Sequence, residues 1–478
     1  MSSRRLVTLG VLGGAFLAAI EATIVSTVMP TVVDHLGGLS HYAWVFSAYI
    51  LTSTVTMPLW GRMSDLYGRR TFYLAAVGVF LLGSALSGAS QSMGQLIAFR
   101  AIQGVGAGGL LPLGMTIIGE LYTLKERAKA QAWFSGVWGL ASIVGPLIGG
   151  FLADRVSWRW VFYLNLPFGA IAAALVGMSL VDRRSPEPPR IDYRGAAVLS
   201  ACITLFLLAL SQTGVPDASL DKFQLAAFYA VSAVLGVWFL RIEQQVPQPI
   251  LPLSLLSNAY VGSSTVVGFL TGIAMFGVLS FVPLFVQSAM GKTATQAGSA
   301  LTPLLLGWVV MSVVTSQVLP KVGFRRMVMA GLTCISLGFF GLTRMTHDSP
   351  MPALWLSLGV MGVGMGMAML SLLLAGQSAV PREQLGIATS LGQFSRSIGG
   401  AVGVALMGTV MTASLAALQE THMPLARAVE LSLHRAFIVG TIVALVALAA
   451  STKVPRGFPK RPPEASPIAT AASESSTV

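Results

Sequence analysis

Charged residues are scarce in this sequence of 478 residues. Asp, Glu, Lys and Arg together make up 10% of it, whereas they supply about 25% of an ordinary soluble domain. Hydrophobic residues make up 54%. A chain with this balance has too little polar surface to cover a globule in water. The composition therefore excludes a soluble protein and predicts one that lies in a lipid bilayer.

Cysteine and histidine are also rare. The two cysteines, Cys202 and Cys334, lie in apolar segments, where we expect them to pack as small hydrophobic side chains without forming a disulfide or a metal site. The five histidines lie in or beside predicted loops and show no metal-ligand spacing. The sequence also has no phosphate-binding loop and no constellation around a nucleophile. We therefore expect neither an enzyme nor an ATP-driven pump, and no metal or organic cofactor.

Long apolar runs make up most of the sequence. Fourteen of them approach the roughly 20 residues that a helix needs to cross a bilayer. A barrel would instead show short stretches of alternating polarity, so we predict an all-α integral membrane protein. The predicted spans are residues 6–28, 43–60, 72–92, 95–118, 131–152, 159–180, 193–213, 223–241, 261–287, 298–319, 327–345, 353–376, 386–411 and 433–452.

Basic residues predict how these spans are oriented. With the N-terminus inside, 21 of the 30 Lys and Arg fall on the inner side, 7 fall on the outer side, and Arg100 and Arg396 fall deep inside spans. This bias follows the positive-inside rule, so it supports the count of spans and predicts that both termini are cytoplasmic. The net charge of +12 is therefore a signal of membrane topology, and we expect no nucleic-acid partner.

One carboxylate, Glu21, interrupts the first apolar run. An ionisable group at membrane depth is costly, so by default it marks a transport pathway or a proton relay and has a partner. At 1.5 Å per residue, Glu21 lies roughly 10 Å below the outer end of the first span, and Arg100 lies roughly 8 Å below the outer start of the fourth. The two residues therefore lie at similar depth, whereas the spacing does not say whether their helices are neighbours. A static ion pair that only holds helices together is the alternative.

The stretch Gly-Arg-Met-Ser-Asp-Leu-Tyr-Gly-Arg-Arg at residues 61–70 joins the second and third spans on the predicted inner side. Glycines near both ends permit a tight turn and a close helix approach. Asp65 is the only acid among three arginines, and it can make charge-assisted hydrogen bonds to a neighbouring helix end. A plain basic loop with a turn, which is the alternative, does not require this spacing.

Five further stretches join this loop in resembling one family. They are residues 20–30 in the first span, 100–106 in the fourth, 139–150 in the fifth, 158–167 entering the sixth and 393–400 in the thirteenth. Together these motifs resemble those of the major facilitator superfamily. Three of them, at 20–30, 158–167 and 393–400, resemble its branch of fourteen-helix drug:proton antiporters. The resemblance covers all the predicted spans.

The resemblance implies a role for each matching residue. In the loop at 61–70 it implies a gate that latches the two halves of the protein on the inner side. The implied gating residues are Gly61, Asp65, Gly68, Arg69 and Arg70.

In the first and fourth spans the resemblance implies that Glu21 and Arg100 couple transport to protons, and Gln103 lies one turn after this arginine. The family usually has Asp in the first span. Glu21 keeps the charge, but its extra methylene moves the carboxylate.

In the fifth span the resemblance implies the motif associated with exporters. Small residues there allow close helix packing, and the proline bends the helix. The motif residues are Gly145, Pro146, Gly149 and Gly150.

A weak internal repeat suggests the domain organisation. Residues 321–326 are a degraded echo of the Gly-Arg-Arg end of the first loop, which predicts paired six-helix halves with two inserted helices between them. A polar, proline-rich linker follows the sixth span, and the end of the chain lacks any apolar period. The predicted regions are an N-terminal bundle at 1–180, linkers and inserted helices at 181–260, a C-terminal bundle at 261–453 and a disordered cytoplasmic tail at 454–478.

Four residues are candidates for lining the substrate pathway: Glu21, Gln103, Met365 and Arg396. Arg396 lies near the middle of its span, and no acid lies at matching depth in the second half. Bonding to backbone carbonyls is its alternative role. Met365 belongs to a methionine-rich stretch whose side chains can repack around varied ligands, although ordinary packing is the alternative.

We therefore predict a proton-coupled antiporter of the cytoplasmic (inner) membrane that exports lipophilic, cationic drugs or toxic compounds by alternating access. We expect it to act as a monomer, with the substrate, protons and the lipid bilayer as its partners and the proton as its coupling ion. Two alternatives are left open. One is export of an anionic or lipid-like cellular metabolite, with Arg396 as the recognition charge, and the other is a non-transporting membrane sensor or scaffold.

Overall fold

The computed structural model describes residues 3–36, 42–181, 192–213, 221–246, 249, 251, 253–292, 294–419 and 424–459. Over this part of the chain the structure is helical and contains no strand, as the sequence predicts. The proline-rich linker predicted after the sixth span falls at residues 182–191, which lie outside the described residues, as does the predicted tail beyond residue 459.

Each of the fourteen predicted spans falls on one or two helices. Among the described residues, ten helical segments are long and apolar enough to cross a membrane. In chain order the helices are α1 (Ser3–Leu36), α2 (Tyr42–Tyr67), α3 (Arg69–Gly88), α4 (Met93–Leu121), α5 (Leu124–Arg155), α6 (Trp160–Tyr163), α7 (Asn165–Ser179), α8 (Tyr193–Gln212), α9 (Lys222–Glu243), α10 (Leu253–Ser257), α11 (Ala259–Leu284), the π-helix η2 (Phe285–Ala289), α12 (Ala294–Ala300), α13 (Thr302–Val322), α14 (Phe324–Leu342), α15 (Met351–Ser378), the 3-10 turn η3 (Arg382–Gln384), α16 (Leu385–Gln419) and α17 (Leu425–Ser451).

Prolines explain where two of the predicted spans are interrupted. The span predicted at 159–180 is divided into α6 and α7, because Pro167 has no N–H to donate to the carbonyl of Tyr163, the last residue of α6. The span predicted at 261–287 continues from α11 into η2 just after Pro283, and the N–H of Met290 there bonds to the carbonyl five residues back.

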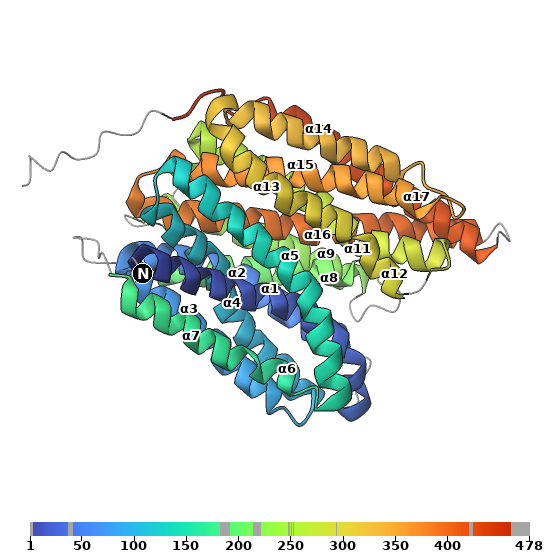
Figure 1. Cartoon of the computed structure of the whole chain (residues 1–478), viewed down its shortest axis with the longest axis horizontal. Coiled ribbons are helices and arrows are strands. Elements are labelled where there is room, and N and C mark those ends of the chain that lie inside the picture. The colour runs from blue at the N-terminus through green and yellow to red at the C-terminus, as the bar shows by residue number, and fades with distance from the viewer. Residues whose placement is uncertain are drawn as a thin grey trace, which may run out of the picture.

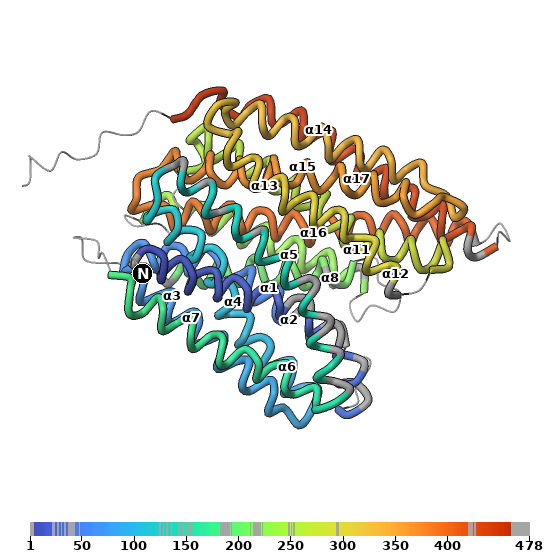
Figure 2. Tube along the Cα trace, in the orientation of Figure 1, coloured from blue at the N-terminus to red at the C-terminus, as the bar shows by residue number. Residues whose placement is uncertain are grey.

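Two helix bundles make up most of the molecule. Helices α1 to α7 pack around one set of hydrophobic cores, which includes Phe80 and Leu110, and α11 to α17 pack around another, which includes Leu332 and Met361. Figures 1 and 2 show the first bundle in blue to green and the second in yellow to red. The first and last described residues lie at the same end of the molecule, which we call the terminal end.

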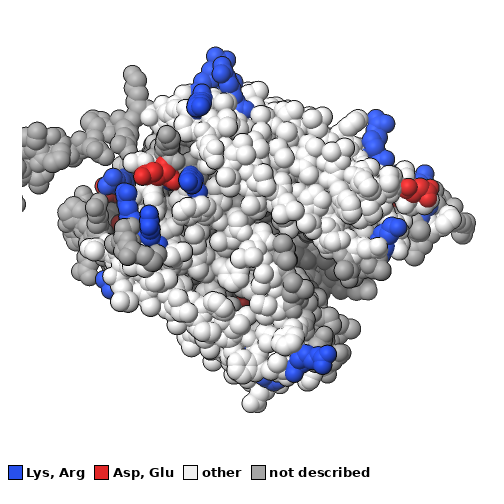
Figure 3. Space-filling view, viewed as in Figure 1, with Lys and Arg blue, Asp and Glu red and all other residues white. Residues whose placement is uncertain are grey.

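The two bundles meet at the terminal end and diverge toward the opposite end (Figure 1). Helix α2 packs against α16, and α5 packs against α13. Helices α8 and α9 lie behind the bundles in this view and contact both α2 and α16 through one hydrophobic cluster. In Figure 3 the charged side chains gather toward the ends of the molecule, and the surface between them is almost free of charge, as expected for a belt that faces lipid.

Candidate functional site

Glu21 lies on α1 and is completely buried. Its Oε1 pairs with Nη1 of Arg100 on α4, and its Oε2 accepts a hydrogen bond from Nδ2 of Asn165 on α7 at 2.6 Å. A buried charge persists only when it is paired and hydrogen-bonded, and both oxygens of this carboxylate meet a donor. The structure thus joins Glu21 and Arg100, which the sequence predicts at similar depth, in one ion pair.

Arg100 is also buried, with 2% of its surface exposed. Its Nη1 donates to Oε1 of Gln103 at 2.7 Å, and its Nε points at the carbonyl oxygen of Val45 at 3.4 Å. The guanidinium lies over the ring of Tyr49, 4.2 Å from the centroid, in a cation–π arrangement. The site therefore pairs the carboxylate of Glu21 with the guanidinium of Arg100, and neutral polar and aromatic groups enclose this pair.

Sequence reasoning assigned no role to Asn165 or Tyr49. Asn165 falls within the stretch 158–167 that carries the family resemblance, but an uncharged amide near a helix start does not stand out in composition. Tyr49 is one of nine tyrosines, and only the packing of α2 against α4 places its ring under a guanidinium. Gln103, by contrast, is brought into the site as the sequence suggests.

A second polar site joins the two bundles at the terminal end. Asp65, near the end of α2, accepts hydrogen bonds from the backbone N–H groups of Gly386 at 3.0 Å and Ile387 at 2.8 Å. These two donors belong to the first turn of α16, where N–H groups have no partner within the helix and a negative charge is favoured. The structure thus places the Asp65 carboxylate as a cap on a helix of the other bundle, and we call this contact the latch.

Arg69 completes the latch. It pairs with Asp65, its Nε donates to Oε1 of Glu120 at 2.8 Å, and its Nη2 donates to the carbonyl of Arg382 at 3.1 Å. Glu120, at the end of α4, was missed in the sequence because only the fold brings this helix end beside the loop. Arg70, the next residue, is exposed.

Two glycines shape the latch. A Cβ on Gly61 would lie only 2.8 Å from the carbonyl oxygen of Gly386, so α2 and α16 meet backbone to backbone. Gly68 separates α2 from α3 with a φ of 112°, a conformation that favours glycine. Both glycines therefore serve the close approach and the tight turn that the sequence predicts.

Asp65 lies beyond the predicted span 43–60. Burial raises the pKa of its carboxyl to about 6, although the charge of Arg69 and the two backbone N–H groups act in the opposite direction. The latch therefore contains a carboxyl group whose pKa lies above its ordinary value.

The glycine-rich α5 packs against the second bundle. A Cβ on Gly139 would lie 3.0 Å from Cγ2 of Val309 on α13. Gly145 and Gly149 are buried, whereas the surroundings of Pro146 and Gly150 lie outside the described side chains. Small residues on this helix thus permit a close contact between the bundles.

A cavity of about 40 Å³ lies in the second bundle between α11, α15 and α16. Met369, Gln393 and Arg396 line it. Nη1 of Arg396 lies 3.5 Å from the sulfur of Met369, and Nη2 bonds to the amide oxygen of Gln393. Among the described residues, Arg396 forms no ion pair with an acid.

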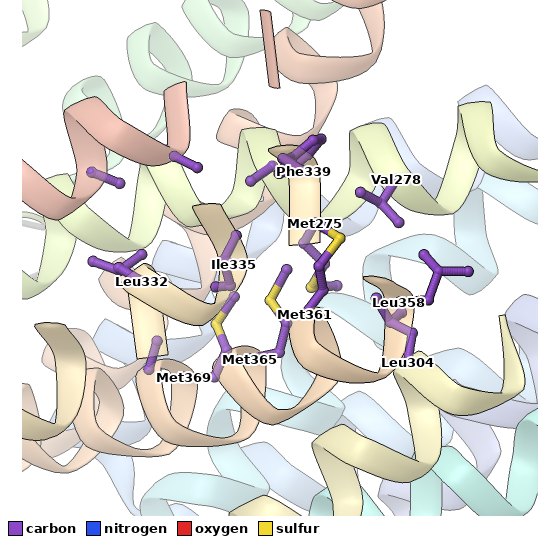
Figure 4. Close-up of a cluster of buried hydrophobic side chains, with 14 of the residues drawn as sticks. Met275, Val278, Leu304, Leu332, Ile335, Phe339, Leu358, Met361, Met365 and Met369 are labelled. Atoms are coloured by element: carbon purple, nitrogen blue, oxygen red, sulfur yellow. The ribbon is translucent and has the colours of Figure 1, made fainter. Parts of the chain in front are cut away.

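Met365 lies in the same hydrophobic core as Met369 but is not among the residues that line the cavity. It is completely buried in the hydrophobic core of the second bundle, beside Met361 and Ile335 (Figure 4). One helical turn further along α15, Met369 reaches the cavity wall. The methionine-rich stretch therefore supplies both core packing and cavity lining, and its sequence alone does not separate the two.

Comparisons with known proteins agree with this architecture. The profile of the Major Facilitator Superfamily matches residues 11–404. The multidrug transporter protein MdtP of Bacillus subtilis is 38% identical over 412 residues, which cover 86% of this chain and 76% of that protein. Multidrug resistance protein 3 of the same bacterium is 34% identical over 411 residues, or 86% and 80% of the two chains. The efflux pump FUS6 of Gibberella fujikuroi is 30% identical over 414 residues, which cover 83% of this chain and 73% of that protein.

Solved structures show the same fold at low sequence identity. The human organic anion transporter MFSD10 (TETRAN) superposes with a TM-score of 0.68 at 16% identity, over 94% of this chain and all of that one. The proton:xylose symporter XylE superposes with a TM-score of 0.64 at 15% identity, over 94% and 95%. The profile match and the relatives that share 30% identity or more show that this chain belongs to the major facilitator superfamily of membrane transporters.

Proposed function

We propose that the protein is a proton-coupled antiporter that exports lipophilic, cationic drugs or toxic compounds by alternating access. The observation that carries this proposal is the Glu21 carboxylate, which is fully buried in α1 and paired with Arg100. The names of the similar bacterial and fungal proteins, which describe multidrug transport, multidrug resistance and efflux, support the drug as substrate.

We base proton coupling on the pairing of the Glu21 carboxylate with the Arg100 guanidinium. Protonation of Glu21 removes the only acid that pairs with Arg100 among the described residues, and a buried charge without a partner is strongly destabilising. Proton uptake from outside therefore favours a rearrangement of the bundle. Release of the proton inside restores the pair, and a cationic substrate competes with the proton for the same carboxylate.

The membrane topology belongs to the same proposal. We place fourteen spans in the cytoplasmic membrane, with both termini inside, and keep the division at 1–180, 181–260, 261–453 and 454–478. In this orientation the terminal end is the cytoplasmic end, and the bundles diverge toward the outside. Gly61, Asp65, Gly68, Arg69 and Arg70 then act as the inner gate, and Gly145, Pro146, Gly149 and Gly150 let α5 rock against α13. The monomer is the functional unit.

Arg396 favours a second candidate function. It lines the cavity in the second bundle without an acidic partner among the described residues, so the local charge there is positive. A site of this kind suits an anionic or lipid-like metabolite. Gln103, Met365 and Arg396 remain our candidates for the substrate pathway in either case.

A substrate panel in proteoliposomes distinguishes the two candidates. We expect an imposed pH gradient to drive movement of lipophilic cationic dyes and not of matched lipophilic anions. Movement of the anions alone would replace the first candidate by the second. If the gradient moves neither class, both transport candidates fail.

A further inference from the structure

Asn165 is the first residue of α7 and only 2% of its surface is exposed. Its amide nitrogen donates to Oε2 of Glu21 at 2.6 Å and to Oγ of Ser84 on α3 at 2.9 Å. Ser84 is itself fully buried and donates its single hydrogen to the carbonyl oxygen of Phe162 at 2.8 Å. These bonds form a continuous chain from the backbone of α6 to the carboxylate.

This chain determines which way the Asn165 amide faces. A serine hydroxyl carries one hydrogen, and that of Ser84 is already donated to the Phe162 carbonyl. Ser84 can therefore only accept from Asn165, so the NH₂ group, and not the carbonyl oxygen, faces both Ser84 and Glu21. An NH₂ group favours the ionised carboxylate over the protonated acid, because it offers hydrogens and no lone pair to a carboxyl hydrogen.

We propose that Asn165 is a positioning residue for proton coupling, locked as a donor by Ser84 so that it favours the ionised form of Glu21. Arg100 supplies the countercharge from α4, and Asn165 supplies a neutral donor from α7. The inference deepens the proposed function and rests on Glu21 being the coupling acid.

The test compares pH profiles of transport in proteoliposomes. In Asn165→Leu the carboxylate loses a charge-assisted donor, so we expect the pH of half-maximal transport to rise by about one unit. Ser84→Ala keeps the amide but frees its orientation, so we expect a smaller shift in the same direction. Ser87→Ala is the matched control, because Ser87 is equally buried on α3 and its hydroxyl donates to the carbonyl oxygen of Gly83 within its own helix, at 2.8 Å.

An unchanged pH profile in Asn165→Leu, even with a lower maximal rate, would overturn the inference. If that variant does not fold, an unshifted profile in Ser84→Ala overturns it instead. Wild-type protein and Glu21→Gln are measured beside them. If Glu21→Gln keeps proton-dependent transport, the proposed function fails; if it loses it while the Asn165→Leu profile stays unchanged, only the present inference fails.

A separate observation concerns α8 and α9. One hydrophobic cluster combines Val55 of α2, Ile203 of α8 and Phe239 of α9, and Ile398 of α16 packs against it. The two inserted helices thus cover the contact between α2 and α16, where the two bundles meet. Both α2 and α16 meet this cluster through apolar side chains. Toward α2 there is also a charged contact, because Glu243 at the end of α9 interacts electrostatically with Arg62.

We infer that α8 and α9 move with the first bundle and slide over α16 during transport. Apolar contacts exchange partners without breaking directional bonds, so the α16 side is the one suited to sliding. Motion of the two bundles against each other then occurs without opening the contact between α2 and α16 to lipid.

Reversible cross-links test this inference. In a background with Cys202→Ser and Cys334→Ser, Ile203→Cys is paired either with Val55→Cys on α2 or with Ile398→Cys on α16, and joined by a short cleavable thiol reagent. We expect the link to α2 to leave the transport rate within twofold, and the link to α16 to stop transport until it is cleaved. A blocking link to α2 or a harmless link to α16 would overturn the inference.

Discussion

The carboxylate of Asp65 accepts a hydrogen bond from the backbone N–H of Ile387, 322 residues later in the chain, at 2.8 Å. With the neighbouring bond from Gly386, it ties the end of α2 to the start of α16. Each bundle is held together by its own core, so this contact is between two bodies that the proposed mechanism requires to separate.

Asp65→Ala is expected to loosen the latch. The substitution leaves two N–H groups at the start of α16 without their acceptor, and an unsatisfied buried donor costs about 1–3 kcal/mol. We expect faster thiol labelling of a Ser390→Cys reporter, which lies in the buried contact between α2 and α16. Equal labelling with and without Asp65→Ala would show that the bond contributes nothing to closure.

The latch is also expected to depend on pH. Burial raises the pKa of Asp65 from 3.8 to about 6 in the latched structure, and exposure to water on opening would return it toward 3.8. The latched form thus binds a proton more tightly, so it gains stability relative to the open form as pH falls and loses this gain as pH rises through about 6. Thiol labelling slows with falling pH in any protein, because the thiolate is the reactive form. Between pH 7.5 and 5, labelling of the reporter should therefore slow more steeply with Asp65 in place than in Asp65→Asn, whose side chain cannot titrate.

Gly61→Ala is expected to separate α2 from α16. The new Cβ would approach the carbonyl oxygen of Gly386 to 2.8 Å, and such overpacking costs about 1–3 kcal/mol. Transport should fall because the inner side no longer closes fully. Gly78→Ala is the matched control, since nothing lies within 4 Å of its added Cβ. Similar transport loss in both variants would argue against a special role for the α2–α16 contact.

Arg396→Gln bears on the charge of the substrate. The change removes a positive charge from the cavity wall while keeping a polar side chain beside Met369. Export of a lipophilic cation should persist or improve, because the repulsion is gone. A selective loss of anion export, with cation export absent in wild type as well, would support the second candidate function.

The sequence predicts the charged positions of this protein well and its neutral ones poorly. Glu21 and Arg100 stand out because charge in an apolar run is rare, and depth along two helices places them level. Asp65 stands out as the one acid in a basic loop. In each case the signal is a charged side chain whose burial costs free energy, and the structure shows the oppositely charged or hydrogen-bonding partner that offsets this cost.

Neutral polar residues and helix contacts carry no such signal. Asn165 joins its site only through the packing of α7. Glu120, although charged, joins the latch only because α4 ends beside the loop, and no local pattern specifies either contact. Met365 and Met369 have the same chemistry and lie one turn apart in the same core, and only the packing of α11 and α16 beside α15 leaves Met369 at the cavity wall. The division of the sixth span at Leu164 was visible in principle, because Pro167 removes a helical hydrogen bond.

The most direct test of the account is proton-driven export in proteoliposomes, measured for wild type and Glu21→Gln with equal amounts of folded protein. An inward proton gradient should drive a cationic dye out of the vesicles against its own gradient in wild type, with proton uptake that depends on the dye. Glu21→Gln should lose this coupling. Unchanged gradient-driven export and dye-dependent proton uptake in Glu21→Gln would contradict the assignment of Glu21 as the coupling acid.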